Sequence, residues 1–295
     1  MSTLNEKLIV GCGYLGRRVA ARWVAKGHTV HAVTRSQETA KRFRELGLTP
    51  LVADVTRPPS LAALSDLTNV DTVLFAVGFD RSVGIPIQDV YVAGLSHILD
   101  ALHAGIQRLI YISSTGVYGQ TDGSWVDEDS PCLPTRDGGK ACLAAEQLLS
   151  SSPFADRVVA LRLAGIYGPE RVPRKSDLLS NKSFPQDGHL NLIHVDDAAS
   201  TVLAAEQLAI SPCTYVVSDG NPVLRADYYK ELKRLLNVTP TSGDQSATAS
   251  TDGTTRNERA RADKKIRADR YLADLKVELK YPDYRTGLAA IVKSE

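Results

Sequence analysis

The 295-residue sequence predicts an α/β fold: a doubly wound parallel sheet with a small C-terminal lobe. The sheet is predicted because short apolar runs alternate with longer segments whose apolar residues recur every three or four positions. Right-handed crossovers place such helices on both faces of a parallel sheet. The lobe is predicted because this alternation loosens after Gly168-Pro169, where proline, glycine and charged residues accumulate.

The order of elements follows from these runs. Strands are expected at residues 7–11, 28–34, 49–55, 71–77, 108–114 and 157–165, and helices at 15–26, 36–46 and 90–104. The expected dinucleotide-binding domain covers 1–168 and is completed by about 190–220, where strand-then-helix character returns. The expected substrate lobe covers 169–189 and 221–295. Within it, 239–259 has few large apolar residues and predicts a loop, and 263–275 predicts a closing helix.

Composition excludes several classes of partner. Lys and Arg number 35 against 34 Asp and Glu, so no overall field attracts nucleic acid or anionic lipid. No apolar stretch reaches the roughly 18 residues that a membrane span needs, and the N-terminus shows no targeting pattern. We therefore expect a cytoplasmic protein. It is expected to be a monomer or a homodimer, and no feature of the sequence selects between the two. The cysteines lack CxxC or metal-ligand spacing, so no metal is expected; they are Cys12, Cys132, Cys142 and Cys213.

A glycine motif follows the first predicted strand. Gly11, Gly13 and Gly16 have G-x-G-x-x-G spacing, with Tyr14 and Leu15 between the last two. Such glycines allow a tight turn, close approach of a pyrophosphate to the backbone, and close packing of helix on strand, while the helix N-terminus offers free N–H groups to the anion. The motif predicts a Rossmann-type NAD(P) site, although three glycines can also simply form a tight turn.

The second strand ends without the acidic residue that would bind a ribose 2′-hydroxyl. Arg35 and Ser36 stand there instead, and a guanidinium suits a 2′-phosphate. The sequence therefore favours NADP, with NAD as the alternative and a solvated Arg35 as the simpler interpretation. Two further groups are expected along the cofactor, Asp54 and Val55 near the adenine and Ala76, Val77 and Gly78 near the ribose.

Taken in order, the glycine motif, YISSTGVYG (111–119), Lys140, LAGIYGP (163–169) and NLIHVDD (191–197) resemble the extended short-chain dehydrogenase/reductases, a family that includes sugar-nucleotide epimerases and dehydratases. The resemblance implies NAD(P) binding, with Ala164 and Ile166 beside the cofactor. It implies that Ser114 is catalytic, with Thr115 adjacent, and that Lys140 binds the nicotinamide ribose.

The chain departs from the family at the tyrosine four residues before this lysine. Arg136 stands there, and a guanidinium cannot cycle a proton. This departure, with YPDYR at 281–285, is similar to an atypical subgroup often called YeeZ-like. Because Gly138 and Gly139 disfavour a helix, we expect the helix to begin near Lys140, with 136–139 in a loop.

Several side chains could replace the tyrosine or hold substrate. Tyr118 is the candidate proton donor, with Tyr167 and Asp137 as alternatives; each tyrosine could equally pack in the core. His194 could contact substrate or brace the lobe junction. A basic cluster could hold an anionic substrate group or be solvated; its members are Arg171, Arg174, Lys175 and Lys182.

Two functions follow from these residues. One is an NAD(P)-dependent oxidoreductase or epimerase-like enzyme acting on a small carbonyl compound or a sugar-nucleotide-like substrate, with Ser114 polarising the carbonyl. The other is a non-catalytic NADP-binding sensor or regulatory module, which the missing tyrosine motivates. Retention of Ser114 and Lys140 favours the enzyme, because a sensor has no evident need for a hydroxyl beside the nicotinamide.

Overall fold

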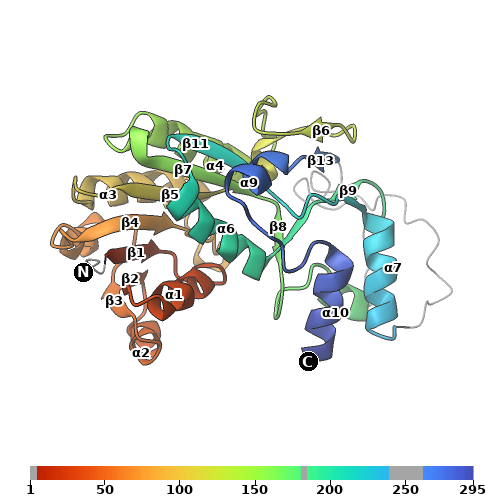
Figure 1. Cartoon of the computed structure of the whole chain (residues 1–295), viewed down its shortest axis with the longest axis horizontal. Helices are drawn as coiled ribbons and strands as arrows, with labels where there is room; N and C mark the ends of the chain where they lie inside the picture. Colours follow the sequence, from red (N-terminus) through yellow and green to blue (C-terminus); the bar gives the residue numbers. More distant parts are fainter. Residues whose placement is uncertain (1–4, 181–184, 239–261, 295) are drawn as a thin grey trace.

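The main sheet has seven strands, all parallel, in the order β11-β7-β5-β4-β1-β2-β3 (Figure 1). A computed structural model describes residues 5–180, 185–238 and 262–294. The strands are β1 (Glu6–Val10), β2 (Thr29–Thr34), β3 (Thr49–Val52), β4 (Val70–Phe75), β5 (Arg108–Ser114), β7 (Val158–Leu163) and β11 (Cys213–Val217). Six of them confirm the predicted strands, and β11 completes the sheet beside β7. From β1 the chain adds β2 and β3 on one side of the sheet and then crosses to the other side of β1 to form β4. The carboxyl ends of β1 and β4 therefore flank the crevice in which such folds bind ligands.

Helices cover both faces of this sheet, which confirms the doubly wound prediction. One hydrophobic cluster joins one face to the first helices, to α6 and to α9, and the other cluster joins the opposite face to α3 and α4. The helices of these layers are α1 (Gly16–Ala25), α2 (Gln37–Glu45), α3 (Gly94–Ala101), α4 (Asp137–Ser150), α6 (Val195–Leu208) and α9 (Asp269–Asp274). The turn η3 (Asp89–Ala93) of π type leads directly into α3, so the predicted helix at 90–104 begins with a wider turn and ends earlier.

A separate core lies beside the carboxyl edge of the sheet, on the right in Figure 1. It is built around Tyr167, Tyr228 and Tyr284 and closed by α7 and α10, which pack together. Its elements are β8 (Gly165–Tyr167), α5 (Lys175–Leu179), β9 (His189–Leu190), β10 (Leu192–His194), β12 (Val223–Leu224), α7 (Arg225–Leu235) and α10 (Tyr284–Ser294).

The segment before α9 differs from the sequence-based expectation. Instead of one helix over 263–275, residues Lys265–Ile266 form β13, which pairs in parallel with β6 (Trp125–Val126), and only Asp269–Asp274 is helical. Tyr271 and Leu275 pack in the main core rather than in the lobe. The chain therefore returns from the lobe to the main sheet here. The loop expected at 239–259 lies outside the described residues.

Candidate active site

A cavity of about 960 Å³ lies along the carboxyl ends of β1, β2, β4, β5 and β7. Its wall includes the glycine loop at one end, Ser114 in the middle, and residues of the small lobe at the other end. The size falls within the range of roughly 300–1,000 Å³ that is usual for small-molecule and cofactor sites. One continuous cavity therefore joins most of the side chains that the sequence analysis singled out.

The glycine loop has the steric properties that its motif predicts. Gly11 adopts φ +94°, and a Cβ there would lie 2.5 Å from the backbone of Ala76. A Cβ on Gly16 would lie 2.6 Å from the Gly11 carbonyl oxygen, so the third glycine permits the helix to approach the strand. A Cβ on Gly13 would meet no atom within 4 Å. Gly13, Tyr14 and Leu15 line the cavity, whereas Gly16 lies behind them.

Arg35, at the end of β2, also lines the cavity, together with Asp54, Val55, Ala76, Val77 and Gly78. Its guanidinium is half exposed and lies 3.8 Å from the Asp80 carboxylate, a loose ion pair. Ser36 does not line the cavity, because its hydroxyl caps α2 by accepting a hydrogen bond from the Thr39 N–H. Of the two residues expected at a 2′-phosphate, only Arg35 therefore lies in the cavity wall.

Ser114 ends β5 and lines the middle of the cavity with Thr115. Its Oγ accepts a hydrogen bond from the Gly116 N–H at 3.0 Å, which fixes the side chain at the start of the short helix η4 (Thr115–Val117). Ala164 and Ile166, from the segment after β7, line the cavity nearby.

Helix α4 does not begin where the sequence analysis expected. It starts at Asp137, with Arg136 as its N-cap in an extended conformation, so both glycines are helical. A Cβ on Gly139 would lie 2.1 Å from the Gly116 carbonyl oxygen, and this close contact is the tertiary reason for tolerating glycines there. Arg136 lines the cavity.

Lys140, in contrast, is exposed and does not line the cavity. The inward face of α4 is defined by Gly139, Cys142 and Glu146, three and four residues apart. Lys140 lies one residue, about 100° of helix rotation, beyond Gly139 and faces outward. The expectation that Lys140 stands beside the nicotinamide therefore finds no support in this geometry.

The two candidate tyrosines are core residues. The Tyr118 hydroxyl accepts a hydrogen bond from Arg162 at 2.8 Å, and Arg162 also pairs with Glu146 at 2.7 Å. Burial raises the pKa of Tyr118 well above its usual value. Tyr167 is fully buried and donates to the Asp283 carbonyl oxygen at 3.3 Å. Neither tyrosine lines the cavity, and the exposed Asp137 does not line it either.

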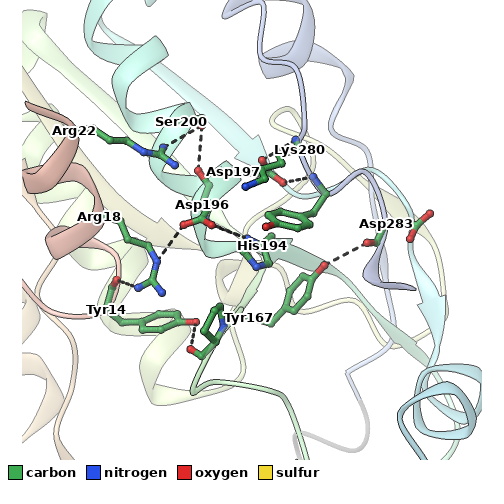
Figure 2. Close-up of polar contacts among 12 residues, drawn as sticks. Tyr14, Arg18, Arg22, Tyr167, His194, Asp196, Asp197, Ser200, Lys280 and Asp283 are labelled. Carbon is green, nitrogen blue, oxygen red and sulfur yellow. Dashed lines mark hydrogen bonds and ion pairs between the residues drawn. The ribbon is translucent and has the colours of Figure 1, made fainter. Parts of the chain in front are cut away.

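His194 braces the junction between the main domain and the lobe (Figure 2). Its ring lies 3.8 Å from that of Tyr281 and edge-on to that of Tyr167, and its Nδ1 accepts from the Asp196 N–H. Next to it, the Asp197 carboxylate accepts from the backbone N–H groups of Lys280 and Tyr281, each at 2.9 Å. Burial lowers the pKa of His194. It is absent from the cavity wall, so a role in substrate contact finds no support and the bracing interpretation fits.

The predicted basic cluster is divided by the fold. Arg171 and Arg174 line the cavity. The guanidinium of Arg171 lies 5.5 Å from the centre of the Tyr14 ring, and Arg174 pairs with Asp177 at 2.7 Å. Lys175 lies in α5, outside the cavity wall. Lys182 lies outside the described residues.

Several cavity residues were not predicted from the sequence, among them Tyr91, Cys142, Asn191 and Lys264. Cys142 could have been found, because the apolar spacing of Cys142, Ala145 and Leu149 marks the inward face of α4. Burial raises the pKa of Cys142 to about 11, which keeps its thiol protonated. Lys264 gave no signal, because its neighbours in the sequence are charged and the segment joins the site only through tertiary pairing.

No cluster of metal-ligating side chains occurs in the described part of the chain. The described helices are also too short or too polar to cross a membrane.

Comparisons with known proteins agree with this architecture. Residues 8–217 match the model of the NAD dependent epimerase/dehydratase family. Protein YeeZ of Escherichia coli K12 is 28% identical over 243 residues, which cover 80% of this chain and 86% of YeeZ. A Stigmatella aurantiaca protein, 4-hydroxy-2-methyl-3-oxo-4-farnesyl-3,4-dihydroquinoline-1-oxide ketoreductase, is 30% identical over 230 residues, which cover 72% of this chain and 67% of the ketoreductase.

A solved structure gives the same result over the whole chain. A candidate NAD-dependent epimerase/dehydratase from Methylobacillus flagellatus superposes with a TM-score of 0.78 at 30% identity and covers 99% of both chains. The motif order, the parallel sheet and these matches lead to one conclusion. The chain belongs to the NAD-dependent epimerase/dehydratase family, within the extended short-chain dehydrogenase/reductases.

Proposed function

We propose that this chain is an NAD(P)-dependent oxidoreductase that acts on a small carbonyl compound and prefers NADP. The observation that supports this proposal is the single cavity that joins the glycine loop to Ser114. A dinucleotide needs the first part of this cavity, and a carbonyl substrate needs a hydrogen-bond donor in the second part.

The residues of the cavity fit a nicotinamide dinucleotide. Open space at Gly13 leaves backbone N–H groups accessible to a pyrophosphate at the start of α1, where the helix dipole favours an anion. Arg35 would bind a 2′-phosphate by exchanging its loose contact with Asp80 for a charge-assisted pair. A bound nicotinamide supplies or accepts hydride.

Ser114 would polarise the substrate carbonyl. Its Oγ already accepts from the Gly116 N–H, and within the described residues its own hydroxyl hydrogen has no acceptor. That hydrogen is therefore available to an oxygen that gains negative charge as hydride is transferred, and stabilisation of such an oxyanion is commonly the largest single catalytic effect. Tyr118 is not included in this proposal, because its hydroxyl is bonded to Arg162 outside the cavity.

The second candidate is an NADP-binding sensor without catalysis. It is favoured by the absence of a phenol from the start of α4 and by the outward orientation of Lys140, which together remove the usual proton relay of the family.

Reduced-cofactor turnover separates the two functions. The purified chain is loaded with NADPH and given panels of aldehydes, ketones and sugar nucleotides, while the absorbance of reduced nicotinamide is followed. We expect oxidation with at least one panel, and a loss of roughly 100-fold in Ser114→Ala with unchanged NADPH affinity. Ser65→Ala, which removes an exposed hydroxyl from the distant turn after η1 (Pro58–Leu64), serves as the control. Tight NADPH binding without turnover in any panel would instead support the sensor.

A further inference from the structure

Lys264 presents a buried cation in the wall of the cavity. The residue is 7% exposed, and its Nζ donates to the Tyr118 carbonyl oxygen at 2.6 Å. Tyr118 follows η4, which begins directly after Ser114, so the ammonium group is linked to the loop that positions the candidate catalytic hydroxyl. The lobe end of the cavity and its central serine are joined through this contact.

The backbone around Lys264 is held at several points. Lys265 pairs with Trp125 through β13 and β6. The amide of Asn191 bridges the same segment, because its Nδ2 donates to the Lys264 carbonyl oxygen at 2.9 Å and its Oδ1 accepts from the Ile266 N–H at 2.8 Å. The position of the lysine is therefore fixed by the fold.

Within the described part of the chain, no carboxylate lies within ion-pair distance of Lys264 or of Arg136. Arg174 of the same wall has such a partner, because it contacts Asp177 at 2.7 Å, whereas the guanidinium of Arg171 lies over the Tyr14 ring. Burying a positive charge without a counter-charge is unfavourable, and a second cation nearby adds repulsion.

The pKa of Lys264 reflects this environment. Burial and, to a lesser extent, the nearby charge of Arg136 together lower it to about 8. At neutral pH the side chain is still mostly protonated, so the cavity wall contains two cations that repel each other. An anion would relieve both the desolvation and the repulsion.

We propose that Arg136 and Lys264 bind an anionic group of the substrate, a carboxylate or a phosphate, so that the reaction at Ser114 acts on an anionic carbonyl compound. This inference rests on the proposed oxidoreductase function and adds the substrate class. Arg136 occupies the position where the family's tyrosine was expected, and here its fixed charge serves binding rather than proton transfer. The two residues lie on opposite parts of the chain, one at the start of α4 and one before β13.

Calorimetric titration of the NADP⁺-loaded protein tests the pair. Oxalate, inorganic phosphate and the neutral oxamide are titrated separately, so that the first two distinguish carboxylate from phosphate. We expect at least one anion to bind and oxamide not to bind. Lys264→Met and Arg136→Gln should each weaken that anion roughly 10- to 100-fold, Lys264→Arg should retain most of the affinity, and all variants should bind NADP⁺ as the wild type does.

Lys265→Met is the matched control, because Lys265 is adjacent in sequence but lies over the Trp125 ring and not in the cavity wall. Unchanged anion affinity in both Lys264→Met and Arg136→Gln would overturn the inference, and so would an equal loss of NADP⁺ affinity, which would assign the pair to the cofactor. If NADP⁺ binds but neither anion does, this inference fails alone. If NADP⁺ itself does not bind, the proposed function fails and the inference fails with it.

Discussion

Replacement of Lys264 by methionine should stabilise the ligand-free protein. The pKa of this lysine falls from 10.5 to about 8, chiefly through burial. One pKa unit corresponds to about 1.4 kcal/mol, so the charged side chain costs the folded state roughly 3 kcal/mol at neutral pH. Methionine has a similar length, but it leaves the Tyr118 carbonyl without its donor, which costs about 1–2 kcal/mol. We expect a net gain of about 1–2 kcal/mol in the free energy of unfolding.

This gain should depend on pH in a defined direction. Because the pKa of Lys264 is lower in the folded chain than in the unfolded chain, the folded chain binds fewer protons between pH 8 and 10.5, and wild-type stability rises through that window. The charge penalty that Lys264→Met removes is therefore greatest below pH 8 and falls to less than about 1 kcal/mol at pH 10, so the variant should be no more stable than the wild type at pH 10.

Urea unfolding at pH 7 and pH 10 measures both effects. The buffers contain no phosphate, because an anion bound at the site would stabilise the wild type by mass action. Lys265→Met is the control and should change stability little at either pH. The argument that Lys264 is a buried charge with no counter-ion among the described residues would be refuted by a variant that is less stable than the wild type at pH 7. It would also be refuted if the free energy of unfolding changed by the same amount at both pH values.

Three further outcomes follow from the same structure. Gly11→Ala should lose both dinucleotide binding and stability, because the positive φ of Gly11 and the backbone of Ala76 exclude a Cβ. Gly13→Ala should keep the wild-type melting temperature and lose only cofactor affinity, because a Cβ there meets no protein atom. Calorimetry measures the cofactor affinity, and thermal melts measure the stability. Arg35→Ser should weaken NADPH roughly 10-fold or more and leave NADH nearly unchanged, and equal effects on both would contradict a 2′-phosphate contact. Burial raises the pKa of Asp219 to about 7, so the folded chain holds this proton more tightly than the unfolded chain does. The stability that the protonated carboxyl contributes is fully present below pH 3.8 and is lost as pH rises through 7. Chemical denaturation should therefore find Asp219→Asn more stable than the wild type at pH 8 but not at pH 4.

The sequence by itself determined the sheet and the glycine-loop end of the cavity. Strand periodicity and the spacing of Gly11, Gly13 and Gly16 are local properties, and each is set by sterics over a few residues. Gly11, with its positive φ, and Ser114, at the end of β5, therefore lie where the motifs predict. The same local reasoning placed Arg35 at the end of β2 and in the cavity wall.

Only the tertiary structure decided which side chains complete the site. The family resemblance implied that Lys140 lies beside the nicotinamide, but Gly139 packs against the Gly116 backbone, and the next residue, Lys140, is exposed. The Tyr118 hydroxyl is held outside the cavity by its hydrogen bond from Arg162, which lies 44 residues further along the chain. Lys264 reaches the cavity through pairing with a strand far away in sequence. Contacts between such distant segments have no local period, so the lobe end of the site could not be predicted from the sequence.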